Sequence, residues 1–259
     1  MDRVPRDRES AAEGGREAEL ARWVAIDGTR TQRGVRLIGE PIIDRCLRLR
    51  TYGIEHIPSS GPAMLCPNHA SYLDPFIHAR GLPRIVRFMA KAQLFAWPLV
   101  GSFIQGGGGF PIRRGAGDTF ALSLAQRLLE DGQLVCVYPE GTRFRDHVDL
   151  GPARTGAARL VMATGVPVVP VASWGNKPRP IHGQRRWSVP RFTTVYGPAV
   201  DCSDLIQPGG ESRAAIERVR DRIWDAVTEV YRVAEQLHET RPSGSAIPAS
   251  VTFSWASSS

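Results

Sequence analysis

The strongest structural signal in the chain is the stretch Ala63-Met-Leu-Cys-Pro-Asn-His-Ala-Ser-Tyr-Leu-Asp-Pro-Phe-Ile-His-Ala-Arg80. Its apolar start, residues 63–66, is typical of a short buried strand that ends at Pro67. Asp74-Pro75 indicates the start of a helix, because proline is favoured in the first helical turn. The residues in between therefore form a turn that connects a strand end to a helix start, where catalytic groups often lie.

Two chemically complementary side chains, His69 and Asp74, lie in this turn. A regular helix would hold them well apart, since five residues at about 100° each place them on different faces. A carboxylate that accepts a hydrogen bond from one imidazole nitrogen fixes the tautomer and stabilises the protonated ring. This is what a general base acting on an alcohol requires, so the pair predicts an enzyme with His69 as base.

A purely structural role is the alternative for the same residues. Asp74 would cap the helix, Ser71 and Asp74 would form a capping box, and His69 would be a hydrogen-bonded core residue. The segment by itself does not separate these interpretations, because a motif match is only a hypothesis.

Strand and helix signals alternate along the 259 residues, which are enough for one α/β domain with a full core. Strands are predicted at 49–54, 63–66, 85–90, 134–138, 168–173 and 191–196, and helices at 75–80, 118–130, 152–164 and 212–240. This alternation predicts a single domain with a mainly parallel, mixed sheet flanked by helices, an N-terminal helical region and a long C-terminal helix. We expect a flexible N-terminus at 1–18, the folded domain at 19–240 and a disordered tail at 241–259.

The net charge of +7 is unevenly distributed. Residues 75–117 and 151–200 contain no Asp or Glu. The first block holds Arg80, Arg84, Arg87, Lys91, Arg113 and Arg114, and the second holds Arg154, Arg159, Lys177, Arg179, Arg185, Arg186 and Arg191. Positive potential should therefore gather around these segments, which implies an anionic substrate or an anionic surface.

Cysteine usage and hydropathy indicate where the protein works. The four cysteines, Cys46, Cys66, Cys136 and Cys202, form no CxxC pair and are expected to be reduced and buried, with no metal bound. No apolar run approaches the ~18 residues of a membrane span, and the charged N-terminus has no signal-peptide core. We expect a cytoplasmic protein whose membrane contact is peripheral.

Three further segments carry possible chemistry. Gly106 to Arg114 places two guanidinium groups after four glycines, a pattern that suits phosphate oxygens or a plain surface loop. Tyr138-Pro-Glu-Gly-Thr-Arg143 follows a buried strand and could hold a hydroxyl and a phosphate, or form a turn with an exposed salt bridge. Val166 to Val171 is an apolar strand between prolines, expected to be core.

In this order the segments resemble the lysophospholipid acyltransferases of the 1-acylglycerol-3-phosphate O-acyltransferase type. Asn68-His69 through Asp74 matches the NHxxxxD block of that family, Gly108 to Arg114 its glycine-to-arginine block, Pro139 to Arg143 its PEGTR block and Val166 to Pro170 its proline block. The resemblance covers residues 52–196, the motif core of the predicted acyltransferase domain. The first and third blocks are specific in combination.

The resemblance implies roles for the residues at the matching positions. His69 would be the catalytic base and Asp74 its partner. The substrate-binding residues would be Glu140, Gly141, Thr142, Arg143, Arg114, Arg113 and Lys91. The chain departs from the usual family pattern at Pro111, Arg113 and Arg154, and the two arginines make the predicted head-group site more basic.

The expected reaction transfers a fatty acyl group from acyl-CoA or an acyl-carrier protein to the free hydroxyl of a lysophospholipid. The first candidate is 1-acylglycerol 3-phosphate, which would give phosphatidic acid, a step of phospholipid biosynthesis. No cofactor beyond the acyl donor is expected, and backbone N–H groups near the His69 turn would stabilise the oxyanion. Expected partners are the lipid, the donor and the inner, anionic face of a membrane, with no nucleic acid.

Other functions remain open at this point. Another lysophospholipid or a glycolipid could be the acceptor. A serine hydrolase is disfavoured, because the chain contains no GxSxG sequence. A basic module that binds a lipid surface or nucleic acid without catalysis is the alternative from a different class, motivated by the two acid-free blocks.

Overall fold

The computed structural model describes residues 6–26, 33–34, 37, 40–41, 44–112, 119–143, 150–175, 191–206 and 212–256. Its helices are α1 (Arg6–Val24), α3 (Asp74–Ala79), α4 (Pro98–Gly106), α5 (Thr119–Glu130), α6 (Gly156–Thr164) and α7 (Arg213–Thr240). Its strands are β1 (Arg50–Tyr52), β2 (Ala63–Pro67), β3 (Val86–Lys91), β4 (Gly109–Ile112), β5 (Leu134–Cys136), β6 (Val168–Gly175) and β7 (Phe192–Tyr196). Short 3₁₀ turns, η1 (Ile54–His56), η2 (Ala92–Ala96) and η3 (Ser203–Leu205), complete the elements.

The strands form one seven-stranded sheet in the order β1-β7-β6-β2-β5-β3-β4. Strands β2 to β6 run parallel to one another, with Leu65 of β2 in register with Cys136 of β5 and Val169 of β6. β1 and β7 are parallel to each other but antiparallel to the rest, because β7 pairs with β6 in the antiparallel sense. The predicted mainly parallel, mixed sheet is confirmed.

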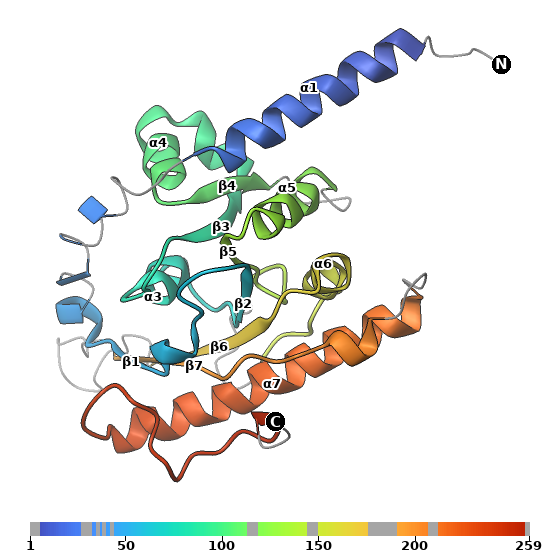
Figure 1. The fold of residues 1–259 in the computed structure, drawn as a ribbon. Helices are drawn as coiled ribbons and strands as arrows, with labels where there is room; N and C mark the ends of the chain where they lie inside the picture. The colour runs from blue at the N-terminus through green and yellow to red at the C-terminus, as the bar shows by residue number, and fades with distance from the viewer. Residues whose placement is uncertain are drawn as a thin grey trace.

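The central strands are apolar on both faces because helices cover both. Met64 and Cys66 of β2 join a core with α5, α6 and α7, whereas Ala63 and Leu65 point to the opposite face. Figure 1 shows α5, α6 and α7 on one side of the sheet and α3 on the other. The long C-terminal helix is confirmed as α7, whose first turn is capped by Ser212 Oγ accepting from the N–H of Ala215.

Functional segments gather at one edge of the sheet. The carboxyl ends of parallel strands lie at the same edge, and here β2 leads to His69, β5 leads to the loop from Tyr138 to Arg143, and β3 ends at Lys91. Because β2, β5 and β3 are consecutive neighbours, segments about 70 residues apart in the chain meet there.

The two chain ends differ from the sequence-based prediction. Helix α1 begins at Arg6, where a flexible N-terminus was expected, and the guanidinium of Arg87 donates to the carbonyls of Trp23 and Ile26 near its C-terminal end. The prediction of a disordered tail is wrong for residues 241–256, since Phe253 is buried against β1, β6, β7 and α7. The tail is rich in serine and proline, and a prediction from composition overlooked its widely spaced apolar residues.

The four consecutive glycines, residues 106–109, form a tight connection rather than an open loop. Gly106 ends α4, Gly108 has φ of 91°, and Gly109 begins β4. A Cβ at Gly109 would lie 2.9 Å from the carbonyl oxygen of Ile104, so α4 can fold back on β4 only with glycine at this position. Neither α4 nor β4 was predicted, because glycine and proline obscure their apolar pattern.

Burial of the other segments follows the sequence expectations in part. Val166, Val168, Val169 and Val171 are core residues, as predicted. Cys66, Cys136 and Cys202 are buried free thiols, whereas Cys46 is exposed. Within the described ranges, no helix combines the length and apolar character that crossing a bilayer requires.

Replacing Phe253 by alanine tests the packing of the tail. Loss of a fully buried aromatic side chain from this cluster should lower the free energy of unfolding by about 3 kcal/mol. Urea denaturation measures the change, and Thr252→Ala at the exposed neighbouring position is the control. Equal stability of the Phe253→Ala variant and the wild type would show that the tail contributes nothing to the fold.

Candidate active site

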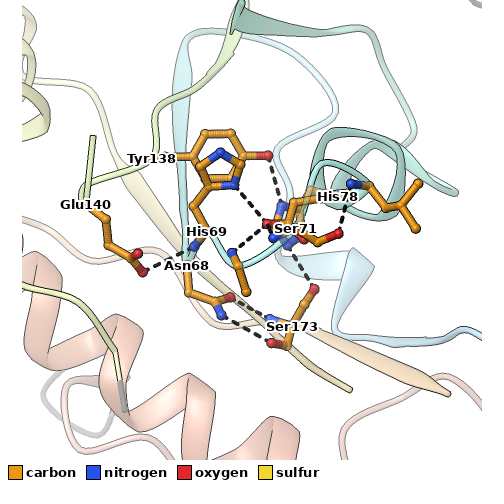
Figure 2. A network of polar contacts seen from close by, with 10 residues as sticks. Asn68, His69, Ser71, His78, Tyr138, Glu140 and Ser173 are labelled. Carbon is orange, nitrogen blue, oxygen red and sulfur yellow. Dashed lines mark hydrogen bonds and ion pairs between the residues drawn. The ribbon is translucent and has the colours of Figure 1, made fainter. Parts of the chain in front are cut away.

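His69 and Asp74 form a buried pair at the end of β2. Nδ1 of His69 lies 2.8 Å from Oδ2 of Asp74, and the same oxygen accepts the N–H groups of Ala70 and Ser71 at 2.8 Å each. With Nδ1 donating to the carboxylate, Nε2 carries the lone pair, which is the tautomer of a general base. Figure 2 shows His69 of this turn beside Tyr138, with Glu140 reaching the His69 backbone.

Part of the capping arrangement named as the structural alternative is present, and it is compatible with a catalytic role for His69. Asp74 accepts the amide of Ser71, which is one half of a capping box, while Ser71 Oγ accepts from the N–H of Leu73 at 3.1 Å. Oδ2 of Asp74 therefore both organises the turn and orients the imidazole of His69.

Tyr138, two residues after the end of β5, supports the His69 ring. The two rings are stacked with centroids 4.0 Å apart and planes inclined by 27°. The phenol oxygen lies 3.3 Å from Nδ1 of His78, which anchors Tyr138 in turn. The imidazole of His69 is thus held by Asp74 at its edge and by Tyr138 on its face.

Glu140 connects the second motif to the first. Its Oε1 accepts the backbone N–H of His69 at 3.2 Å, although the two residues are 71 positions apart. The carboxylate is buried, with only 4% of the residue exposed. This bond brings the loop from Tyr138 to Arg143 against the His69 turn.

The backbone N–H groups of the turn already donate hydrogen bonds to side chains. His69 donates its N–H to Glu140, and Ala70 and Ser71 donate theirs to Asp74. The expectation that N–H groups near this turn stabilise an oxyanion is therefore not met by residues 69–71.

Asn68 joins β2 to β6 beyond the last strand pairing. Its Nδ2 donates to the carbonyl of Ser173 at 3.2 Å, and its Oδ1 accepts the N–H of Ser173 at 2.8 Å. The side chain thereby imitates a strand backbone and fixes the direction in which the chain enters the turn.

A buried polar chain lies behind the pair, and the sequence interpretation missed it. Nε2 of His78 lies 2.8 Å from Ser173 Oγ, which lies 2.8 Å from Thr194 Oγ1, and Tyr196 donates its hydroxyl to the carbonyl of His78. Burial lowers the pKa of His78 to about 4; the Asp74 carboxylate opposes this shift and His69 adds to it. His78 is therefore neutral at pH 7. The sequence feature that could have indicated its place is its position four residues after Asp74, which puts both side chains on the same face of α3.

The loop after Pro139 turns sharply at Gly141. Gly141 has φ of 65°, a conformation that residues with a side chain rarely adopt. A Cβ at this position would also lie 2.8 Å from Cδ of Arg154, so both the backbone and the available space favour glycine. The N–H of Arg154 donates to the carbonyl of Pro139 and holds the loop from below. Gly141 and Thr142 are exposed, and the guanidinium carbon of Arg143 lies 3.3 Å from the centroid of the Tyr72 ring, a cation–π contact.

A cavity of about 270 Å³ opens beside the pair between α3, β3 and α4. His69, Arg143, Lys91 and Arg84 supply its polar lining, and none of the described residues that line it is acidic. Its remaining walls are largely apolar, with Phe76, Val86, Phe88, Met89, Leu94, Phe103 and Ile104 among them. A base and cations at an apolar cavity suit a ligand with an anionic head and a hydrocarbon chain.

Most of the predicted site residues come together. His69, Lys91 and Arg143 line the cavity, Asp74 and Glu140 contact His69, and Gly141 and Thr142 belong to the same loop. Arg113 and Arg114 lie outside the described residues, directly after β4 in the sequence. The missed contributors are Tyr138, His78 and Ser173.

Comparison with known proteins agrees with this arrangement. A family model described as Acyltransferase matches residues 48–174, which contain the His69 turn and the loop from Tyr138 to Arg143. The chain belongs to the acyltransferase family. The family prediction made from the motifs is thereby confirmed.

Individual relatives of this acyltransferase are similar over different extents. A 1-acyl-sn-glycerol-3-phosphate acyltransferase of Bacillus subtilis is 26% identical over 178 residues, 68% of this chain and 86% of the relative. The chloroplastic enzyme BAT2 of Brassica napus is 34% identical over 127 residues, 48% of this chain, and the match spans only 36% of that protein. The crystal structure of the 1-acyl-sn-glycerophosphate acyltransferase PlsC from Thermotoga maritima has a TM-score of 0.55 with 23% identity, covering 87% and 83% of the two chains, which supports the fold.

The lowered pKa of His78 predicts a pH dependence of stability. Between the unfolded value of 6.5 and about 4, the unfolded chain binds a proton that the folded protein does not, so acid lowers the free energy of unfolding. At pH 4.5 this cost should be about 2 kcal/mol, and His78→Gln should lack it. Urea denaturation at pH 4.5 and 7.5 measures it; a wild-type-minus-variant difference that does not change with pH would contradict the prediction.

Proposed function

We propose that this acyltransferase moves a fatty acyl group from acyl-CoA or an acyl-carrier protein to the free hydroxyl of a lysophospholipid. The first candidate acceptor is 1-acylglycerol 3-phosphate, and the product is then phosphatidic acid. The observation that carries the proposal is the His69–Asp74 pair on the wall of an apolar cavity that Arg143 also lines. The names of the Bacillus and Brassica relatives support the same acceptor.

His69 acts as the general base in the proposed reaction. Nε2 of His69 removes the proton from the acceptor hydroxyl while the hydroxyl oxygen attacks the thioester carbonyl carbon. The new C–O bond forms, the C–S bond breaks, and the imidazolium returns its proton to the leaving thiolate. Asp74 stabilises the imidazolium, and since a thioester is already activated, no covalent acyl-enzyme is needed.

Cations bind the acceptor's phosphate in this proposal. Arg143 and Lys91 line the cavity, and Arg113 and Arg114 follow β4 in the sequence. Glu140 has a different role from the phosphate contact that the family resemblance implied. Its buried carboxylate would repel a phosphate and already accepts the His69 amide, so we assign it to positioning the turn.

The apolar part of the cavity holds an acyl chain. Phe88, Met89 and Ile104 provide walls without a charge, next to the imidazole that faces the reacting carbonyl. The enzyme then works at the inner face of the membrane as a peripheral protein, where both lipid substrate and cytoplasmic acyl donor are present.

Replacing His69 by alanine tests the base. Transfer of labelled acyl-CoA to lysophosphatidate should fall at least about a hundredfold, because a positioned general base contributes about 10²- to 10⁴-fold. His56→Ala is the matched control, since that imidazole contacts the Tyr196 carbonyl away from the cavity. An unchanged rate in His69→Ala would remove His69 from the mechanism, and release of free fatty acid without acceptor would indicate a hydrolase instead.

Replacing Arg143 by glutamine tests the head-group assignment. A charge-assisted contact to phosphate is worth about 1.5–3 kcal/mol, so KM for lysophosphatidate should rise at least about tenfold. A neutral acceptor such as monoacylglycerol should show no comparable rise. If both acceptors lose affinity equally, Arg143 supports the loop through Tyr72 rather than the phosphate.

A further inference from the structure

Exposed apolar side chains are concentrated in one part of the described structure. Apart from Leu37, all of the large hydrophobic residues exposed among the described residues lie between positions 72 and 103. We call this group the apolar patch: Tyr72, Leu73 and Phe76 at the start of α3, and Leu94, Trp97, Leu99, Val100 and Phe103 in η2 and α4. Contiguous apolar surface on a folded protein marks an interaction site.

The two halves of the patch lie side by side. The rings of Phe76 and Phe103 have centroids 6.3 Å apart, which brings α3 and α4 together. Tyr72, Phe76, Leu94 and Phe103 also line the cavity beside His69. The patch is therefore continuous with the rim of the proposed lipid site.

The outer surface of α4 has no packing role in the fold. The helix packs through Gly101, where a Cβ would lie 2.7 Å from the Phe95 carbonyl oxygen, and through Ile104, which contacts Gly109. Leu99 is 88% exposed and Trp97 is 67% exposed. Neither side chain lines the cavity, and α4 carries no charged residue. The helix therefore has apolar side chains on its outer surface as well as on the side that packs against the protein.

Asp74, next to Leu73 of the patch, is buried, and the charged side chains described at the surface beside the patch are basic. Residues 75–112 contain no Asp or Glu, Lys91 is exposed at the end of β3, and Arg143 lies on the Tyr72 ring. Apolar and aromatic side chains beside cations suit the boundary between acyl chains and anionic head groups. Two copies of the chain paired through this patch would instead bring like charges together without an acid to compensate them.

We propose that η2, α4 and the start of α3 dock the protein on the surface of a phospholipid bilayer that contains anionic lipids. Trp97, Leu99 and Val100 enter the boundary of the acyl chains, and Lys91 contacts head groups. The cavity rim then faces the membrane, so a lipid acceptor reaches His69 without crossing water. This inference rests on the proposed function for the nature of the substrate, whereas docking itself is measured separately.

Leu99→Glu tests the docking with a matched control. Leu99 is the second residue of α4 and Ala214 the second residue of α7, and both are exposed. A carboxylate is favoured in the first turn of a helix, so Leu99→Glu and Ala214→Glu should both fold, and each adds the same charge. Trp97→Ser is a second variant that adds no charge.

Sedimentation with vesicles of equal parts phosphatidylcholine and phosphatidylglycerol measures the binding. Leu99→Glu should bind at least about tenfold more weakly, since burial of one leucine side chain contributes more than the about 1.4 kcal/mol that corresponds to a tenfold change in affinity. Trp97→Ser should also weaken binding, and Ala214→Glu should bind like the wild type. Wild-type protein that stays in the supernatant, or equal binding by all variants, would overturn the proposal.

Activity assays separate the docking proposal from the proposed function. With a short-chain, water-soluble lysophosphatidate, Leu99→Glu should transfer acyl groups at the wild-type rate, and with the acceptor in vesicles it should be at least about tenfold slower. If wild-type protein transfers to neither acceptor, the proposed function fails while sedimentation still decides docking. A dimeric wild type that Leu99→Glu makes monomeric, with vesicle binding unchanged, would identify a contact between copies and overturn the proposal.

Discussion

One oxygen atom of Asp74 holds the active turn together. Oδ2 accepts hydrogen bonds from the imidazole of His69 and from the amides of Ala70 and Ser71, in a nearly buried position. The imidazole is buried and the two amides are partly buried, and leaving such donors without an acceptor is costly in a folded protein. The direction of the chain between β2 and α3 and the orientation of the base therefore depend on the same interaction. Pro75 is compatible with this turn because the first residues of a helix need no N–H donor.

The sheet extends this local order to the second motif. β2 and β5 are parallel neighbours, so the residues that follow them meet at one edge, where Glu140 accepts the His69 amide and Tyr138 stacks on the imidazole. The neighbouring β3 and α4 supply an apolar cavity and Lys91 beside the same imidazole. The His69–Asp74 pair, the cations and the apolar walls are thus assembled at one end of the sheet, and part of the apolar patch forms the rim of the cavity there.

Much of the fold could be predicted from apolar periodicity, because most strands are continuous apolar runs and α7 repeats its apolar positions with helical spacing. The connection through α4 and β4 could not, since glycine is required at 109 by a close contact with Ile104 and at 108 by a positive φ, and local sequence reveals neither. The tail was misjudged for a related reason. Phe253 is an isolated aromatic residue among small ones, and it is buried only because β1 and α7 provide a surface for it.

By itself the sequence determined the chemistry available to this protein. The sequence places a histidine five residues before an aspartate in a strand-to-helix turn, and a glutamate and an arginine after another strand. These residue types predict a general base and a set of anion-binding groups. Only the tertiary structure decided which atoms these groups contact. Glu140 accepts a backbone amide, His78 is a buried neutral residue behind His69, and Leu99 and Val100 of α4 are exposed. Hydrogen-bond partners and burial depend on segments far apart in the chain, and no local pattern of residues specifies where such segments meet.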